Sequence, residues 1–304
     1  MKMNNCDAWF YTSRNEPRGY IQSQTLEELW FHTGTNCNLR CPSCYEGSKP
    51  GDQRLEFLTL DDVQSFMDEA LDMGVKTFSF TGGEPFVNPD FLDILALALE
   101  YRPCLVLTNA TDPLMKRMAE VQRLRDKPHM LKFRVSLDYP DPDKHDELRG
   151  KGTFHKTLNT LEKLHQAGFS VSVARRMTAE EDSAAVDKTY AHILRTVGIE
   201  QDINIIKFPE FHLLGSLPHV PEITETCMTR YLNNEQRARF MCNYSKMIVR
   251  KDGRCGVYAC TLVDDNNSYD LGATLKGAMQ KRVMLAHHRC YSCFACGTSC
   301  SEGD

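Results

Sequence analysis

Strand-like and helix-like segments alternate along the chain from about Leu29 to Lys207. Such alternation is typical of parallel strands, because parallel neighbours need a long crossover connection that is usually a helix. Strands are expected at about 30–35, 77–80, 104–107, 131–137, 170–177 and 203–207, with helices at about 59–73, 91–99, 156–167 and 183–197. Repeated strand and helix units of this kind predict a partial (β/α)6 barrel that is open on one side.

Three cysteines, Cys37, Cys41 and Cys44, follow the first expected strand with the spacing Cys-x3-Cys-x2-Cys. Three thiolates can hold three irons of a cubane 4Fe-4S cluster and leave the fourth iron open to another ligand. A structural zinc site would need a fourth ligand close by, and none is obvious in the following turn. A zinc knuckle or three buried thiols remain the alternative interpretations of this spacing.

Candidate ligand-binding residues follow several later strands. The turn Gly82-Gly83-Glu84-Pro85 comes directly after the second expected strand. Glycines let a backbone approach a ligand closely, and a glutamate can accept a hydrogen bond from an ammonium group. Ser136 and Asp138 share one face at the C-terminal end of a later strand, where ligands gather in such sheets. Asn109, which follows the strand expected at 104–107, is a further candidate. The alternatives are a solvated strand end or a helix cap for Ser136 and Asp138, and an ordinary turn position for Asn109.

The cysteine spacing and the Gly-Gly-Glu-Pro turn together resemble the radical S-adenosylmethionine (SAM) superfamily. The resemblance implies that Cys37, Cys41 and Cys44 hold a 4Fe-4S cluster whose open iron binds SAM, and that an electron from the cluster cleaves SAM to a 5′-deoxyadenosyl radical. It also implies that the aromatic residue after the third cysteine lies near the adenine. The expected SAM-binding residues are Tyr45, Gly82, Gly83, Glu84, Asn109, Ser136 and Asp138.

The C-terminal segment is rich in cysteine. The run Cys290-x2-Cys293-x2-Cys296-x3-Cys300 has a ferredoxin-like spacing, in which the first three thiolates hold one cubane and the fourth reaches a different cluster. We therefore expect a second auxiliary cluster held by Cys300 with Cys242 and Cys260, and with Cys255 as a further candidate ligand. Zinc sites are the alternative, because Cys-x2-Cys pairs also build zinc ribbons. Between these cysteines, the segment 248–257 predicts a hairpin with an Asp-Gly turn.

This segment resembles the SPASM and Twitch extensions of radical SAM enzymes, which carry one or two auxiliary 4Fe-4S clusters beside the substrate. The late cysteines depart from the usual SPASM spacing, so Cys227 or Cys255 could replace a ligand. The expected fold is α/β, a partial (β/α)6 TIM-like barrel of the radical SAM type with a small cysteine-rich C-terminal auxiliary-cluster domain. The expected boundaries are an N-terminal extension at 1–28, the barrel at 29–207, a connector at 208–239 and the iron-sulfur domain at 240–304.

Composition excludes several other classes of protein. The net charge of −5 is negative, so it gives no sign of a surface that attracts a nucleic acid or an anionic membrane. The N-terminal residues lack the apolar run of a signal peptide, and no stretch approaches the roughly twenty apolar residues that span a bilayer. We therefore expect a cytoplasmic location, where thirteen cysteines indicate metal or redox chemistry in place of disulfides.

The leading hypothesis is a radical SAM oxidoreductase or related radical-transfer enzyme. It would abstract a hydrogen atom from a small metabolite and proceed to oxidation or to C–C or C–S bond formation, with a reductant such as flavodoxin or ferredoxin as its partner. Only about 28 residues precede the first strand, whereas peptide-modifying members often carry a leader-binding domain there. One alternative is a maturase of a ribosomal peptide or protein. A non-catalytic iron-sulfur electron carrier is another, although a carrier would not need the Gly82 to Glu84 turn.

No catalytic acid or base can be assigned from the sequence. His32, His145 and Arg176 are candidates to face the cavity, but a structural role is the favoured interpretation for each of them. The direction in which a strand residue points depends on the register of the strand, which one sequence does not show.

Overall fold

One eight-stranded sheet with the order β7-β6-β5-β4-β3-β2-β8-β9 dominates the computed structural model, which describes residues 5–178, 180–200, 203–209, 211–297 and 301. Strands β2 to β7 follow one another in chain order and pair in parallel, as the alternating pattern predicted. This arrangement confirms the predicted partial barrel. These strands are β2 (Glu28–His32), β3 (Thr77–Thr81), β4 (Cys104–Thr108), β5 (Leu131–Ser136), β6 (Ser170–Met177) and β7 (Ile205–Pro209).

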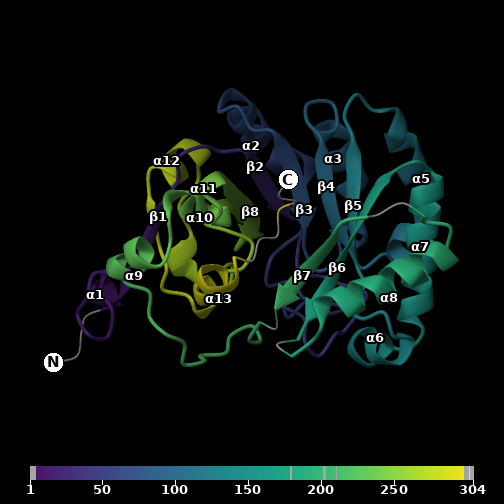
Figure 1. Ribbon diagram of the computed structural model, residues 1–304. Coiled ribbons are helices and arrows are strands. Elements are labelled where there is room, and N and C mark those ends of the chain that lie inside the picture. Colours follow the sequence, from purple (N-terminus) through teal and green to yellow (C-terminus); the bar gives the residue numbers. More distant parts are fainter. Residues whose placement is uncertain (1–4, 179, 201–202, 210, 298–300, 302–304) are drawn as a thin grey trace.

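The helices that connect these strands cover the outer face of the sheet (Figure 1). The first of them begins at the predicted capping box, in which the Thr59 hydroxyl accepts from the Asp62 N–H and the Asp62 carboxylate accepts from the Thr59 N–H. The helices are α2 (Leu60–Asp72), α3 (Phe91–Ala98), α4 (Asp112–Lys116), α5 (Met118–Arg123), α6 (Pro142–Arg149), α7 (Thr153–Gln166) and α8 (Ser183–Thr196).

The first barrel strand ends earlier than predicted. It stops at His32, because Gly34 adopts a positive φ of 113° and the Thr35 N–H donates to the Leu55 carbonyl oxygen instead of to a neighbouring strand. The residues from 33 onward therefore belong to the cysteine-bearing loop. This loop leaves the sheet at the C-terminal end of β2, where ligand sites of parallel sheets lie.

The predicted hairpin is present as β8 (Ser245–Lys251) and β9 (Arg254–Tyr258). Its turn residues Asp252 and Gly253 have φ values of 52° and 73°, as a type I′ turn requires. The hairpin does not stand apart from the barrel, because β8 pairs in parallel with β2 from Glu28 opposite Ser245 onward. The cysteine-rich region therefore extends the central sheet.

The N-terminal segment also packs against the C-terminal region. Strand β1 (Tyr20–Gln22) pairs with β10 (Arg282–Met284), and the Trp9 and Tyr269 rings lie 5.0 Å apart. The buried apolar side chains of the barrel and of the C-terminal region form one continuous core. The remaining helices are α1 (Asn5–Phe10), α9 (Glu225–Arg230), α10 (Asn234–Ala238), α11 (Met241–Tyr244), α12 (Leu275–Met279) and α13 (His288–Cys296).

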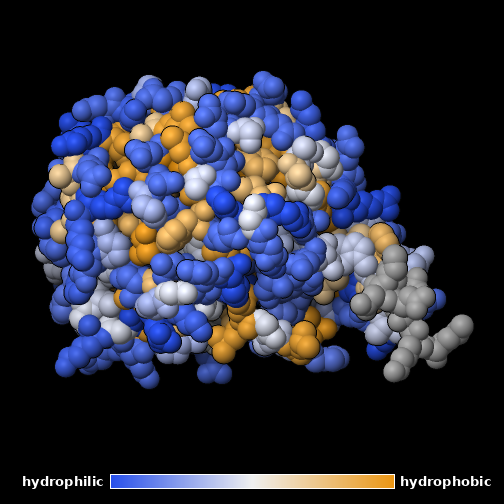
Figure 2. All heavy atoms as spheres, turned by 180° about the vertical axis from the view of Figure 1, so that it is seen from behind, coloured by the Kyte–Doolittle hydropathy of each residue, from blue (hydrophilic) through white to orange (hydrophobic). Residues whose placement is uncertain are grey.

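The surface is largely polar. Figure 2 shows a mostly hydrophilic face with smaller hydrophobic areas between the polar side chains. Within the described part of the chain, no helix is both long enough and apolar enough to cross a membrane.

Candidate active site

The loop after β2 carries the three predicted cluster ligands. Cys37 is buried, Cys41 and Cys44 are half-buried, and all three are free thiols. The Leu39 N–H donates to the Cys37 Sγ at 3.4 Å, and the Cys44 N–H donates to the Cys41 carbonyl oxygen at 3.1 Å. Burial raises the pKa of Cys37 to about 12, and the thiols of Cys41 and Cys44 add to the increase. The three sulfur atoms therefore lie within electrostatic reach of one another.

This donor set fits a cubane cluster better than a single metal ion. Buried thiols with raised pKa values become thiolates only when cations compensate their charge. Among the residues that the structure describes, no three His, Cys, Asp or Glu side chains lie close enough together to bind one metal ion. A cubane binds each thiolate at a different iron, so its ligands lie further apart than the ligands of one ion. The loop is thus compatible with the predicted 4Fe-4S cluster.

The Gly-Gly-Glu-Pro turn packs directly against this loop. The Gly83 N–H donates to the Gly34 carbonyl oxygen at 2.8 Å, and the Glu84 N–H donates to the Asn36 carbonyl oxygen at 3.1 Å. A Cβ atom on Gly83 would lie 2.4 Å from the Asn36 carbonyl oxygen. The sequence predicted a glycine that lets a ligand approach. The structure shows a second reason for it, which is the close approach of the cysteine loop itself.

Replacing Gly83 with Ala should release iron from the Cys37 loop as well as weaken SAM binding. The added Cβ would push the backbone at Asn36 away, and Asn36 immediately precedes Cys37. Iron content and thermal unfolding of the reconstituted protein measure this effect. Gly51→Ala is the control, since its Cβ meets no atom within 4 Å although its φ is +76°. It should cost only the 1–2 kcal/mol or so of a left-handed residue. Full iron content in Gly83→Ala would contradict the prediction.

Glu84 is buried and its carboxylate is held by the protein. It accepts from the Thr108 hydroxyl at 2.8 Å, the Asn109 N–H at 2.8 Å and the Phe86 N–H at 3.3 Å. Burial raises the pKa of Glu84 to about 7 despite these bonds. An ionised carboxylate offers about four acceptor positions, so one remains for an ammonium group. The expected role of Glu84 is therefore compatible with its position.

Asn109 lies against the cysteine loop. Its Nδ2 donates to the Asn38 Oδ1 at 3.0 Å and lies 3.8 Å from the Cys37 Sγ. Its Oδ1 accepts from the Thr111 N–H and hydroxyl. The sequence predicted that Asn109 binds SAM, and the structure places its amide next to Cys37, one of the expected cluster ligands. Hydrogen bonds to ligating atoms orient a metal site and tune its electronic properties.

A cavity of about 140 Å³ lies beside the cysteine loop, at the C-terminal ends of the barrel strands. It is lined from two directions, because Thr261 and Leu262 of the C-terminal region face residues of the barrel. Three predicted SAM-binding residues line it, namely Tyr45, Ser136 and Asp138. The other lining residues are Trp30, Glu46, Thr81, Leu107, Arg149, Ala174, Arg175, Arg176, Phe208 and Phe211.

Asp138 is buried and forms an ion pair with the half-buried Arg149 that the sequence did not reveal. Its carboxylate accepts from the Arg149 Nε at 2.7 Å and Nη2 at 3.0 Å, and the Arg176 Nε lies 3.6 Å away. Burial raises the pKa of Asp138, but the two guanidinium groups outweigh burial and hold that pKa below its usual value. If Asp138 accepts hydrogen bonds from the ribose hydroxyl groups of SAM, as its expected SAM-binding role implies, those hydroxyl groups compete with Arg149 for the same carboxylate oxygens. In the sequence, Arg149 is followed by Gly150 and Gly152, and no local pattern connects it with Asp138.

Removing this carboxylate should destabilise the protein more than a lost ribose contact would. Asp138→Ala leaves the half-buried Arg149 guanidinium without its bidentate partner. Breaking a fully buried pair typically costs about 3–5 kcal/mol, and the partial exposure of Arg149 should place this loss toward the lower end of that range. The free energy of unfolding of the apoprotein in urea measures the effect. Asp138→Asn keeps the shape and should lose less. A loss below about 1 kcal/mol for Asp138→Ala would mean that the pair is not formed in solution.

The candidate acid–base residues divide into two groups. His32 is fully buried with its Nε2 3.2 Å from the Glu46 carboxylate, and the His145 Nδ1 accepts from the Asp138 N–H. Neither histidine lines the cavity, so both have structural positions. Arg176 does line it, and its Nη2 donates to the Ser43 carbonyl oxygen at 2.6 Å.

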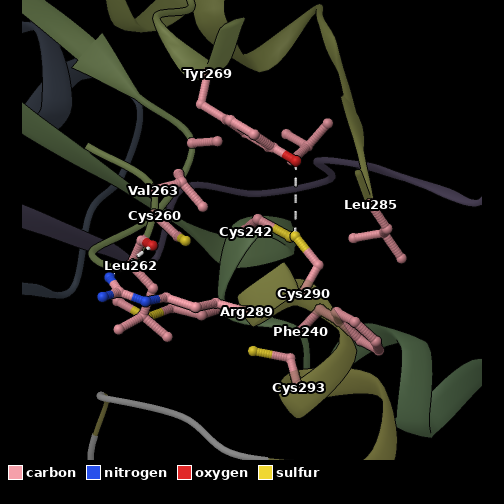
Figure 3. Close-up of a pocket in the computed structure, with 13 residues that line it drawn as sticks. Phe240, Cys242, Cys260, Leu262, Val263, Tyr269, Leu285, Arg289, Cys290 and Cys293 are labelled. Atoms are coloured by element: carbon pink, nitrogen blue, oxygen red, sulfur yellow. Dashed lines mark hydrogen bonds between the residues drawn. The ribbon is translucent and has the colours of Figure 1, made fainter. Parts of the chain in front are cut away.

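A second group of cysteines lines a separate pocket (Figure 3). Cys242 lies in α11, Cys260 follows β9, and Cys290 and Cys293 lie in α13. Burial raises the pKa of Cys242 to about 12 and that of Cys290 to about 11. The buried Lys246 ammonium lies next to Cys242 and donates to its carbonyl oxygen at 2.8 Å. The other lining residues are Phe240, Met241, Ala259, Leu262, Val263, Tyr269, Val283, Leu285 and Arg289.

This pocket bears on the predicted division of the tail cysteines between two clusters. The sequence predicted separate clusters for Cys290 and for Cys242 with Cys260, but the structure brings all of them to one pocket. The reason is that residues three apart on a helix share a face, so α13 directs Cys290 and Cys293 together toward Cys242 and Cys260. The Cys296 side chain and Cys300 lie outside the described residues.

Two other cysteines lie elsewhere. Cys255 on β9 lies beside the Asp62 carboxylate, and burial together with that carboxylate raises its pKa to about 12. Cys227 in α9 accepts from the Thr224 hydroxyl at 3.2 Å. Neither lines the four-cysteine pocket, which we define by Cys242, Cys260, Cys290 and Cys293.

Comparisons with known proteins agree with this geometry. A family model described as "Radical SAM superfamily" matches residues 31–182. The antilisterial bacteriocin subtilosin biosynthesis protein AlbA of Bacillus subtilis (strain 168) is 33% identical over 146 residues, which cover 47% of this chain and 32% of AlbA. A GTP 3′,8-cyclase of Mannheimia succiniciproducens is 30% identical over 136 residues, covering 44% of this chain and 39% of the cyclase. The chain thus spans about a third to two fifths of these relatives.

A solved structure shows the same fold. Streptococcus suis SuiB bound to its precursor peptide SuiA superimposes with a TM-score of 0.59 at 14% sequence identity. The superposition covers 84% of this chain and 64% of SuiB.

Proposed function

Because the chain belongs to the radical SAM superfamily, we propose that it abstracts a hydrogen atom from a bound substrate and directs the product toward oxidation or toward C–C or C–S bond formation. Members of this family use a 4Fe-4S cluster and SAM, which when bound supply a 5′-deoxyadenosyl radical. The observation that carries the proposal is the cavity that Tyr45, Ser136 and Asp138 of the barrel share with Thr261 and Leu262 of the C-terminal region.

The proposed roles follow the positions of the residues. Cys37, Cys41 and Cys44 would hold the SAM-site cluster, and Glu84 would accept from the SAM ammonium with its remaining acceptor position. Tyr45 contributes an aromatic ring to the cavity, with the Arg176 guanidinium 5.1 Å from the ring centroid. Phe208 and Phe211 provide apolar surface that would exclude water from the reacting carbon.

We further propose an auxiliary 4Fe-4S cluster in the four-cysteine pocket. Four thiols converge there among apolar side chains, and Leu262 lines both this pocket and the cavity. A site this close to the substrate suits removal of one electron from a substrate radical, which would complete a net oxidation. Buried Lys246 supports the assignment, because its positive charge offsets part of the negative charge of thiolate-bound iron.

Two substrate classes have support. A small metabolite is the first proposal, and the similarity to a GTP 3′,8-cyclase favours it. A peptide is the second, and the similarity to AlbA, a bacteriocin biosynthesis protein, favours that class.

The test is whether anaerobically reconstituted and reduced protein converts SAM to 5′-deoxyadenosine. An electron carrier would form none. Adding metabolite fractions or peptide fractions separately should stimulate the formation of 5′-deoxyadenosine with one class only, and mass spectrometry then identifies the product. No 5′-deoxyadenosine under any reducing condition would refute the proposed enzyme.

A further inference from the structure

One buried arginine connects the two cysteine sites. Arg289 lies in the first turn of α13 and is 1% exposed. Its Nη2 donates to the Tyr45 carbonyl oxygen at 2.6 Å and to the His212 carbonyl oxygen at 3.4 Å, while its Nη1 donates to the Leu262 carbonyl oxygen at 3.2 Å. Figure 3 shows this side chain reaching from the helix that carries Cys290 and Cys293 to Leu262. The guanidinium therefore joins segments that are far apart in sequence.

The contacted residues lie next to cluster ligands on both sides. Arg289 immediately precedes Cys290, and Tyr45 immediately follows Cys44. Leu262 comes two residues after Cys260 and lines both the pocket and the cavity. A single charge-assisted hydrogen bond thus links the backbone of the SAM-site loop to the backbone of the four-cysteine pocket.

The chemistry of arginine makes this link sensitive to what fills the pocket. A guanidinium keeps its charge, and a buried charge is costly unless opposite charge lies near it. All three acceptors of Arg289 are neutral carbonyl oxygens, so its only nearby opposite charge among the described contacts is the Asp265 carboxylate, with which it interacts electrostatically without a hydrogen bond. Thiolates that carry a cluster in the adjoining pocket would add negative charge and fix the first turn of α13. The fixed turn would in turn hold the Tyr45 backbone at the edge of the SAM cavity.

We propose that Arg289 is a positioning residue that couples the two cysteine sites, so that a filled four-cysteine pocket tightens SAM binding at the Cys37–Cys44 loop. The inference rests on the proposed function, because both sites must hold their clusters for the coupling to act. Energetic coupling between sites is reciprocal, so bound SAM should also help the pocket retain its iron.

A double-variant comparison of SAM affinity tests this coupling. The Kd for SAM is measured by equilibrium dialysis on the reconstituted full-length chain for wild type, Arg289→Gln, Cys242→Ala and the double variant. Each single change should raise the Kd about tenfold, within the range usual for coupled sites. The double variant should be no weaker than the weaker single variant, because both changes remove the same connection.

Two further variants separate positioning from general structural damage. Arg237→Gln is the matched control, because Arg237 also donates to two backbone carbonyl oxygens, those of Met228 and Leu232. This control variant should bind SAM with the wild-type Kd. Arg289→Lys keeps the charge but cannot span the same acceptors, so its Kd should be intermediate. The change in the electron paramagnetic resonance signal of the reduced SAM-site cluster on adding SAM should be weaker in Arg289→Gln than in wild type. If Arg289→Gln does not fold, the Kd of Arg289→Lys for SAM is compared with that of the wild type instead.

A wild-type Kd in an Arg289 variant that retains all its iron would overturn the coupling. The coupling would also be overturned if the fold-increases in Kd of the two single variants multiplied in the double variant, because the two residues would then contribute independently to SAM binding. A wild-type protein that holds only about four irons, those of a single cubane, would refute the auxiliary cluster and this coupling with it. The iron count therefore distinguishes failure of the proposed function from failure of the role of Arg289.

Discussion

Replacing Cys37, Cys41 and Cys44 together with alanine is expected to abolish reductive cleavage of SAM while the iron of the C-terminal region stays bound. The three thiols lie on one loop after β2, whereas the cysteines of the four-cysteine pocket come from α11, from α13 and from the segment that follows β9. The loop lies beyond the sheet, so the fold should survive the change. Formation of 5′-deoxyadenosine and iron per chain measure the two effects on the same sample.

The matched control is Cys227→Ala, which removes a half-buried thiol that lines neither site. This variant should keep both SAM cleavage and iron. Continued SAM cleavage by the triple variant would refute the assignment of the SAM-site cluster. Loss of all iron from the triple variant would show instead that the two sites are not independent in assembly.

Cys242→Ala and Cys290→Ala are each expected to remove the same auxiliary cluster. Although these residues are far apart in sequence, they line one pocket, so either change should lower the iron content from about eight to about four per chain at four irons per cubane. The same spectroscopic signal should disappear from both variants, and the double variant should lose no more than either single one. Anaerobic reconstitution followed by iron analysis and electron paramagnetic resonance checks this.

Other outcomes would indicate a different distribution of the C-terminal cysteines among metal sites. If Cys242→Ala and Cys290→Ala remove separate signals, the tail holds two clusters as the ferredoxin-like spacing alone suggested. About twelve irons in the wild-type protein would support the same conclusion. Stoichiometric zinc in protein purified without oxygen would exclude an auxiliary iron-sulfur cluster. Cys255→Ala should leave the signal intact, because Cys255 lies beside Asp62 and not in the pocket.

The site illustrates where sequence motifs succeed. The spacing of Cys37, Cys41 and Cys44 and the Gly82 to Pro85 turn lie on loops that follow adjacent parallel strands, so local pattern and strand order bring them together. Asn109 and Asp138 could be predicted as ligand-binding candidates for the same reason, because both directly follow strands of the same sheet. Their partners could not be predicted, because side-chain pairs such as Asp138 with Arg149 depend on how the following helix packs.

Local rules determined much of this protein from sequence alone. The Thr59 and Asp62 capping box and the Asp252-Gly253 turn rest on interactions between residues close in the chain, which the order of residue types encodes directly. The alternation of strand-like and helix-like segments predicts the parallel order of β2 to β7, although the paired residues themselves are far apart in the chain. Only the tertiary structure decided the rest. The parallel pairing of β2 with β8, the approach of Gly83 to Asn36 and the Arg289 bond to Tyr45 join segments distant in sequence. Such contacts depend on packing of the whole core, which no local pattern specifies.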